Sequence, residues 1–178
     1  MIKGMIGLEV KDKDFALAFK RAIEIWSGVR ATFHFNKHKS LYRVGLYSIL
    51  AVKFFREFNL EQLKDSSTKV KAAFISGFFD AEGGVSGSNL DKPRIATRFI
   101  ACFNTNKELI DLVSYLLVSI GISIQNVDLR KNTGITGKCD CYRLRIGRRE
   151  NLEKFYSKVG FKIRRKQEHL KRVLESYS

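Results

Sequence analysis

Residues 74–85 read FISGFFDAEGGV. The apolar residues of this stretch, with small residues between them, predict a helix that can approach a second helix backbone to backbone. The helix is expected to end at two consecutive glycines, and two acids, Asp80 and Glu82, come just before them. Negative charge at the C-terminal end of a helix is unfavourable by about 0.3–1 kcal/mol, because that end already carries partial negative charge. These acids are therefore expected to need a cation, which a bound divalent metal ion would supply.

The sequences on either side of this helix follow one pattern, repeated at an offset of about 94–100 residues. A helical stripe of apolar residues runs from Phe15 to Trp26 in the first copy and from Leu109 to Leu117 in the second. Thr105 and Glu108 have the spacing of a capping box, which predicts the start of the second helix. The chain therefore looks like a duplication.

Each of these helices precedes two predicted strands and a closing helix. Strand-like alternation places Tyr142, Leu144 and Ile146 on a buried face and Arg143 and Arg145 on the opposite face, where they could meet a ligand. The predicted strands and closing helices are residues 29–35, 41–47 and 49–58 in the first copy and residues 122–129, 140–147 and 150–158 in the second, with residues 62–71 as the connection. We therefore expect an α+β protein made of two similar units, residues 1–66 and 67–178.

The composition favours a basic, folded, intracellular protein. Lys and Arg number 33 against 18 Asp and Glu, a net charge of +15, and this excess attracts polyanions, of which nucleic acid is the commonest and a membrane surface the rival. The charge is spread over both predicted units. No run of about 18 apolar residues exists, so no membrane span is expected. Three cysteines without a CxxC pair indicate neither a disulfide framework nor a zinc site.

Residues 75–83 resemble the nine-residue motif of the LAGLIDADG homing endonucleases. The glycine, both acids and the final glycine match, with Glu in place of Asp at the second acid. The predicted elements over about residues 70–178 also follow the α-β-β-α-β-β-α order of that family's unit. The resemblance implies an antiparallel β saddle in the DNA major groove, with helices packed on its convex face. It further implies an interface between paired motif helices, which would include Ile75, Gly77, Phe78 and Phe79.

The function implied by this resemblance is hydrolysis of a specific double-stranded DNA site with Mg²⁺. Glu82 would be the catalytic metal ligand, with Gly83 beside it, and Asp80 would have a structural role at the helix end. The family tends to place a lysine near the scissile phosphates, and Lys11 stands at that position of the first unit. Thr105 occupies the matching place of the second unit.

Several polar residues are candidates for contacting DNA. Arginine can pair bidentately with guanine, and lysine and loop residues more often hold phosphates. The candidates are evenly spaced basic residues on the second unit's first strand pair, two polar residues of its third strand, and the two arginines of its last strand. They are Lys92, Arg94, Arg98, Ser123, Gln125, Arg143 and Arg145.

The first unit departs from the family's pattern because no motif helix or leading strand precedes it. The chain is then a fragment of a two-motif protein, a homodimer through its single motif helix, or a relative that binds without cutting. An exposed motif helix would favour self-association. The rival function is a non-catalytic DNA-binding protein or RNA maturase on the same scaffold. Residues for intein splicing are absent from both ends, which favours an intron-encoded protein, and residues 159–166 are similar to archaeal members.

Overall fold

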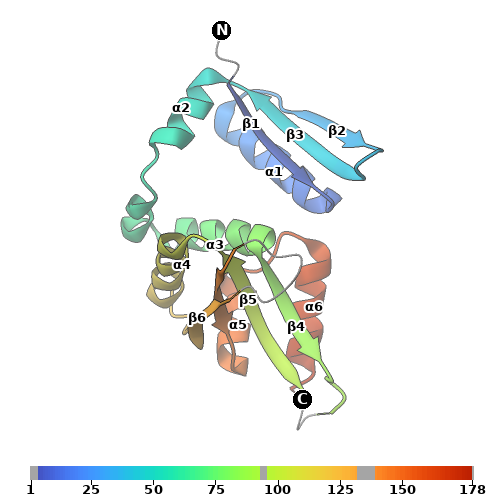
Figure 1. The fold of residues 1–178 in the computed structure, drawn as a ribbon, viewed down its shortest axis with the longest axis vertical. Coiled ribbons are helices and arrows are strands. Elements are labelled where there is room, and N and C mark those ends of the chain that lie inside the picture. The colour runs from blue at the N-terminus through green and yellow to red at the C-terminus, as the bar shows by residue number, and fades with distance from the viewer. Residues whose placement is uncertain (1–3, 93–95, 132–138, 178) are drawn as a thin grey trace. The chain divides into compact units, whose positions relative to one another are not determined.

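The computed structural model describes residues 4–92, 96–131 and 139–177. The chain divides into two units, Met1–Leu60 and Glu61–Ser178, each described here by itself (Figure 1). Within the described residues, every helix is too short or too polar to cross a membrane.

The N-terminal unit is a three-stranded antiparallel sheet with one long helix on one face. Its elements are β1 (Met5–Val10), α1 (Lys13–Ser27), β2 (Thr32–Asn36), β3 (Leu41–Tyr47) and α2 (Ile49–Glu57), and the strand order is β1-β3-β2. Ala16 and Ile23 of α1 pack with Val44 and Leu46 of β3 to form its small core. The apolar side chains that alternate along β3 thus fix which face α1 covers.

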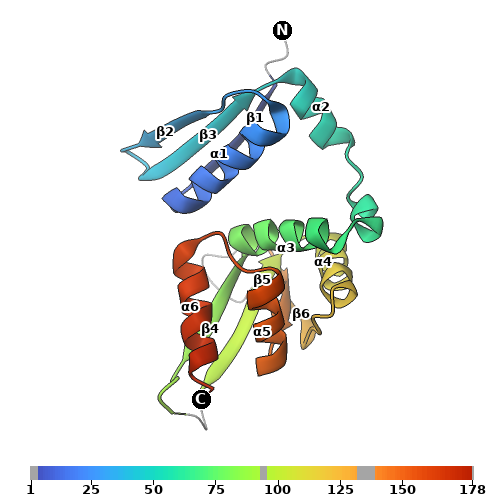
Figure 2. The ribbon, with the colours of Figure 1, turned by 180° about the vertical axis from the view of Figure 1, so that it is seen from behind.

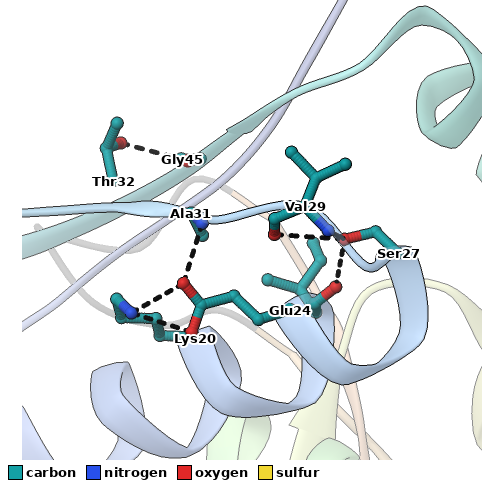
Figure 3. A network of polar contacts seen from close by, with 8 residues as sticks. Lys20, Glu24, Ser27, Val29, Ala31, Thr32 and Gly45 are labelled. Atoms are coloured by element: carbon teal, nitrogen blue, oxygen red, sulfur yellow. Dashed lines mark hydrogen bonds and ion pairs between the residues drawn. The ribbon is translucent and has the colours of Figure 1, made fainter.

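A polar network fixes the chain where α1 ends and β2 begins (Figure 3). The Glu24 carboxylate accepts hydrogen bonds from Lys20 Nζ at 2.7 and 2.8 Å and from the Ala31 backbone N–H at 2.9 Å. These contacts, the lysine first, hold the pKa of Glu24 below its usual range. The Ser27 hydroxyl accepts from Val29 N–H at 3.1 Å, so the turn between helix and strand is closed by side chains.

Over its described residues, the C-terminal unit is a four-stranded antiparallel sheet of order β4-β5-β7-β6 with four α-helices. Apolar side chains from all four helices form its core with the sheet, and Phe79 and Phe155 meet there with ring centroids 5.1 Å apart. Its elements are η1 (Leu60–Asp65), α3 (Thr68–Glu82), β4 (Gly83–Ser88), β5 (Thr97–Asn104), α4 (Lys107–Ser119), β6 (Asn126–Arg130), β7 (Cys141–Ile146), α5 (Arg149–Lys158) and α6 (Arg164–Glu175).

The strand register divides this sheet into a covered face and an open face. Directly opposed residues of antiparallel strands point to the same face. The pairs Ile100 with Ile146 and Cys102 with Leu144 are buried and lie on the covered face. Figure 2 shows α5 and α6 in front of β4 and β5 on that side. We call the opposite side the open face; its residues include Ser86, Phe99, Phe103, Asn126, Asp128, Arg130, Arg143 and Arg145.

The two units share one order of elements. The series β1-α1-β2-β3-α2 corresponds to β5-α4-β6-β7-α5, and both series pair their strands in the same order. Asp12 and Asn106 are the N-caps of the corresponding helices α1 and α4. Among the described residues, α3, β4 and α6 have no counterpart in the N-terminal unit. The fold class is confirmed: antiparallel sheets carry helices on one face in an α+β chain.

Two predicted boundaries are wrong because other side chains supply the caps. The start of α4 is not a Thr105–Glu108 capping box, since Asn106 Oδ1 accepts from Leu109 N–H at 3.1 Å. Helix α3 begins inside the predicted connection, because Ser67 Oγ accepts from Val70 N–H.

Candidate nucleic-acid interface

Helix α3 ends at Glu82, where the four-stranded sheet begins. Glu82 is the last residue of the helix and is exposed, and the next residue, Gly83, begins β4 opposite Cys102 of β5. The glycine is required for close packing, since a Cβ atom there would lie 2.7 Å from the Phe79 side chain. The helix-to-strand junction therefore places a carboxylate at the edge of the sheet without a loop between them.

Asp80, two residues before Glu82, has a different environment. It is 3% exposed, and its carboxylate accepts from Lys162 N–H at 2.8 Å and Ile163 N–H at 3.2 Å. Burial raises the pKa of Asp80 above its ordinary value, and the two backbone hydrogen bonds partly oppose that shift. Asp80 thus holds the segment that leads into α6, as expected for a structural residue.

Lys166 of α6 neutralises the C-terminal end of α3. Its ammonium donates to the backbone carbonyls of Phe79 at 3.2 Å, Asp80 at 2.7 Å and Gly83 at 2.6 Å. The cation expected at this helix end is therefore a lysine side chain, which binds carbonyls where the helix carries partial negative charge. Gly83 is therefore not a candidate metal ligand, because its carbonyl oxygen already accepts a hydrogen bond from this ammonium.

The remaining candidate metal ligand is the Glu82 carboxylate. Within the described residues, no group of three or more His, Cys, Asp or Glu side chains is arranged to hold a metal ion. Mg²⁺ usually binds through one or two carboxylates and completes its coordination with water and substrate phosphates. One exposed carboxylate fits an ion held jointly with a phosphate backbone, and it does not fit a preformed protein cage.

Lys11, the predicted catalytic lysine, is exposed at the end of β1 in the N-terminal unit. Glu82 belongs to the C-terminal unit. The corresponding place in that unit, just before the N-cap of α4, holds Thr105. The two predicted catalytic side chains therefore lie in different units of the chain.

The two arginines of β7 lie on the open face, as their alternation predicts. Arg143 Nε donates to Asp128 Oδ1 at 3.0 Å, and its side chain is 16% exposed. The Arg145 guanidinium lies over the Phe99 ring, 3.9 Å from its centroid. Arg145 Nε is buried without a hydrogen-bond acceptor.

The prediction that Arg98 lies beside these two arginines is wrong. Its neighbours in the register place it on the covered face, and it reaches the C-terminal end of α6. Arg98 Nε donates to Ser176 Oγ and Nη2 to the Ser176 carbonyl, both at 2.9 Å, and its guanidinium lies 4.7 Å from the Tyr177 ring centroid. Arg98 therefore anchors the end of the chain and does not face a groove.

Three of the other predicted contact residues, Lys92, Ser123 and Gln125, lie off the strands. Lys92 is exposed in the turn between β4 and β5, and Arg94 lies outside the described residues. Ser123 and Gln125 precede β6, where the Gln125 N–H donates to the Arg145 carbonyl at 2.7 Å. Both side chains line a pocket of about 120 Å³ together with residues 147, 148 and 151. The third strand begins only at Asn126, so the predicted strand residues 122–125 are wrong.

The comparison with known families agrees with the element order. The family described as LAGLIDADG-like domain matches residues 69–160. The chain belongs to the LAGLIDADG family. That match runs from the start of α3 to the end of α5 and contains Glu82 and the open face.

Relatives of this LAGLIDADG chain occur in Methanocaldococcus jannaschii. The uncharacterized protein MJ0398 is 32% identical over 95% of this chain and 62% of its own length. A probable translation initiation factor IF-2 is 35% identical over 58% of this chain, but the match is 8% of that protein. The chain thus spans less than two thirds of the length of each of these relatives.

Solved structures show the same fold at low sequence identity. The homing endonuclease I-DmoI in complex with DNA and Ca has a TM-score of 0.66 at 17% identity, over 96% of this chain and 84% of that chain. Full-length DUF199/WhiA from Thermatoga maritima has a TM-score of 0.60 at 14% identity, over 98% of this chain and 53% of that chain.

The LAGLIDADG helix α3 buries two of the residues expected at its interface. Ile75 and Phe79 are fully buried in the core of their own unit, so their prediction as interface residues is wrong. Gly77 is exposed, and open space surrounds the position that a Cβ atom would take there, whereas Phe78 is half-buried. The exposed side of α3 includes Val70, Ala73, Gly77 and Ala81.

Sequence reasoning missed several residues of the open face, and four of them contact the arginines of β7 or their network. Asn126, Asp128 and Arg130 alternate with Val127 and Leu129 along β6, and this alternation was the available signal. The fourth residue is Phe99. Neighbouring residues of a strand point to opposite faces, so the prediction that groups Arg98 with the arginines of β7 excludes Phe99 from their face.

Proposed function

We propose that this LAGLIDADG chain binds a specific double-stranded DNA site through its open face and hydrolyses phosphodiester bonds there with a divalent metal ion. The observation that carries the proposal is an exposed carboxylate, Glu82, at the junction between α3 and a sheet whose open face is basic. A protein that only binds DNA gains nothing from a carboxylate beside phosphates, since the two repel each other.

The open face has the side chains for DNA recognition. Arg130, Arg143 and Arg145 outnumber the single carboxylate of Asp128 on β6 and β7. These strands form an antiparallel ribbon, and the major groove of B-DNA admits such a ribbon. The net charge of +15 would draw the chain to a duplex at long range. Binding in this geometry brings the end of α3 toward the duplex backbone.

Glu82 would hold the metal ion through its carboxylate. When bound, the ion supplies charge stabilisation to the phosphodiester and acidity to water. In hydrolysis, a water oxygen attacks phosphorus, the bond from phosphorus to a sugar oxygen breaks, and that oxygen takes up a proton. Asp80 and Lys166 keep the end of α3 fixed, which holds the Glu82 backbone in place during the reaction.

Cutting both strands requires two such carboxylates, and the described residues contain one LAGLIDADG helix. A homodimer through the exposed side of α3 would supply Glu82 twice. The small residues Ala73, Gly77 and Ala81 leave room there for a second helix. The length of MJ0398 outside the match allows the other possibility, a second helix in a longer chain.

The first test is selection of a binding site followed by cleavage. Duplexes that bind the chain are enriched from a random library without divalent ions, and the enriched sequence is then incubated with Mg²⁺ or Mn²⁺. For an intron-encoded endonuclease, the enriched sequence should match the junction of its host gene. We expect metal-dependent cleavage within the bound sequence.

Glu82→Gln should retain binding and lose cleavage by at least about 100-fold, because it removes the metal-binding charge and keeps the shape. Glu153→Gln is the matched control, since it removes one exposed carboxylate from α5. Normal cleavage by Glu82→Gln would contradict the role given to that residue. Binding without cleavage by the wild type would instead favour a non-catalytic binding protein, and a preference for RNA would favour a maturase.

A further inference from the structure

Asp128 lies at the centre of a side-chain network on the open face. Its Oδ1 accepts from Arg143 Nε at 3.0 Å and from Asn126 Nδ2 at 2.9 Å, and its Oδ2 lies 2.9 Å from Arg130 Nε. A carboxylate in the middle of a basic surface weakens the attraction of that surface for phosphates. Its presence there needs an explanation other than affinity.

The network restrains Arg143 in a definite way. A guanidinium has five N–H donors, and the bond from Nε occupies the edge nearest the side-chain stem. The far edge, with both Nη nitrogens, is the edge that can pair with O6 and N7 of guanine. A restrained arginine also loses less side-chain freedom when it binds, so the correct base gains over the wrong one.

The same device occurs in the N-terminal unit, at the corresponding position of its sheet. Arg43 of β3 corresponds to Arg143 of β7, and its Nε lies 3.2 Å from Glu9 Oε1 on the neighbouring strand β1. The carboxylate comes from a different strand in each unit. The side chains of Arg43 and Glu9 are 55% and 44% exposed, whereas those of Arg143 and Asp128 are 16% and 31% exposed. The restraint is therefore stronger in the C-terminal unit.

Arg145, two residues further along β7, is restrained by a ring and not by a carboxylate. Its guanidinium lies over Phe99, and Gly45 takes its place in the N-terminal unit. Stacking leaves the N–H donors of the guanidinium uncommitted, and the buried Nε has no acceptor. The two arginines of β7 are thus held by two different means.

We propose that Asp128 is a specificity-determining positioning residue, which holds Arg143 so that it reads one guanine of the target. This inference rests on the proposed DNA binding, and it does not require cleavage. Asp128 lowers the sequence-independent affinity of the open face and raises its discrimination between bases. Phe99 has the corresponding role for Arg145.

The test measures base discrimination in place of activity. The selected duplex is changed one base pair at a time, and the dissociation constants are measured for the wild type and for Arg143→Ala, which locates the base pair that Arg143 reads. At that base pair, Asp128→Asn should lower the discrimination at least fivefold. Its affinity for a random duplex should stay the same or increase by up to threefold, because one negative charge has been removed.

Asp111→Asn is the matched control, since it removes one carboxylate from α4, where Asp111 pairs with Lys107. It should keep the wild-type discrimination at every position. Circular dichroism spectra of each variant establish that it is folded. Unchanged discrimination in a folded Asp128→Asn would overturn the inference while leaving DNA binding intact. Absence of any duplex binding by the wild type would overturn the proposed function and this inference together.

Discussion

At the scale of single residues, Asp80 and Lys166 form a reciprocal clamp between α3 and the start of α6. The Asp80 carboxylate accepts from two backbone N–H groups just before α6, and Lys166 donates to two carbonyls of α3 and to the Gly83 carbonyl just after it. Asp80→Ala leaves the N–H groups of Lys162 and Ile163 without their acceptor. Since an unsatisfied buried group costs about 1–3 kcal/mol, we expect the free energy of unfolding to fall by about 2–4 kcal/mol.

Denaturation followed by circular dichroism measures this loss. Trp26 is the single tryptophan and lies in the N-terminal unit, so its fluorescence gives a reference transition. The variant Asp80→Asn is the control for the pH dependence of stability, because it has no carboxylate at this position. Because the folded-state pKa of Asp80 is raised above 3.8, its contribution to stability is complete below that pH and decreases as the pH rises through the raised value. The wild type should therefore lose stability relative to Asp80→Asn over that range, and a constant difference would contradict the burial of this carboxylate.

At the scale of elements, local pattern predicted the faces of some strands and not of others. In β7, apolar residues alternate with arginines, and period two alone places Arg143 and Arg145 on the open face. In β5, Phe99 and Phe103 lie on the open face and Arg98 lies on the covered face, because Arg98 has partners near the C-terminus, 78 residues away in sequence. A local pattern contains no information about such partners. The position of Glu82 at a helix end followed from the glycines, whereas Lys166 could not be assigned to that helix end without the fold.

The exposed side of α3 is the element for which association is predicted. Gly77 has open space around it, so a larger side chain there fits the unit and obstructs only a partner helix. We expect wild-type chains to self-associate at micromolar concentration and Gly77→Arg to sediment as a monomer. Gly77→Ala should be intermediate in association, and it should stabilise α3 by about 0.5–1 kcal/mol because glycine is a poor helix former.

Sedimentation velocity at several concentrations distinguishes these outcomes. Lys71→Ala changes a half-buried residue of α3 outside the small-residue side and serves as the control. A wild type that stays monomeric over the micromolar range would rule out the homodimer as the source of a second Glu82. Equal association of Gly77→Arg and the wild type would place the contact on another surface.

At the scale of the whole molecule, charge predicted a polyanionic partner but not where it would bind. Residues 1–66 contain 12 basic and 7 acidic residues, and residues 67–178 contain 21 and 11, so both units are basic. The C-terminal unit uses part of this charge internally: Lys166 binds backbone carbonyls and Arg98 binds the C-terminal segment. Only the register of the strands separates these structural cations from those of the open face. Counting charges in the sequence therefore overestimates the number of basic residues that can contact DNA.

The salt dependence of binding tests how much of that charge reaches DNA. Each phosphate that the chain neutralises releases counterions, so the affinity for a duplex should fall by roughly 10³ or more between about 50 and 200 mM salt if six or more phosphates are contacted. Titrations of a labelled duplex at four or five salt concentrations give the slope, and anionic lipid vesicles serve as the alternative polyanion. A shallow slope with the duplex, or equal binding to the vesicles, would contradict a DNA-binding open face.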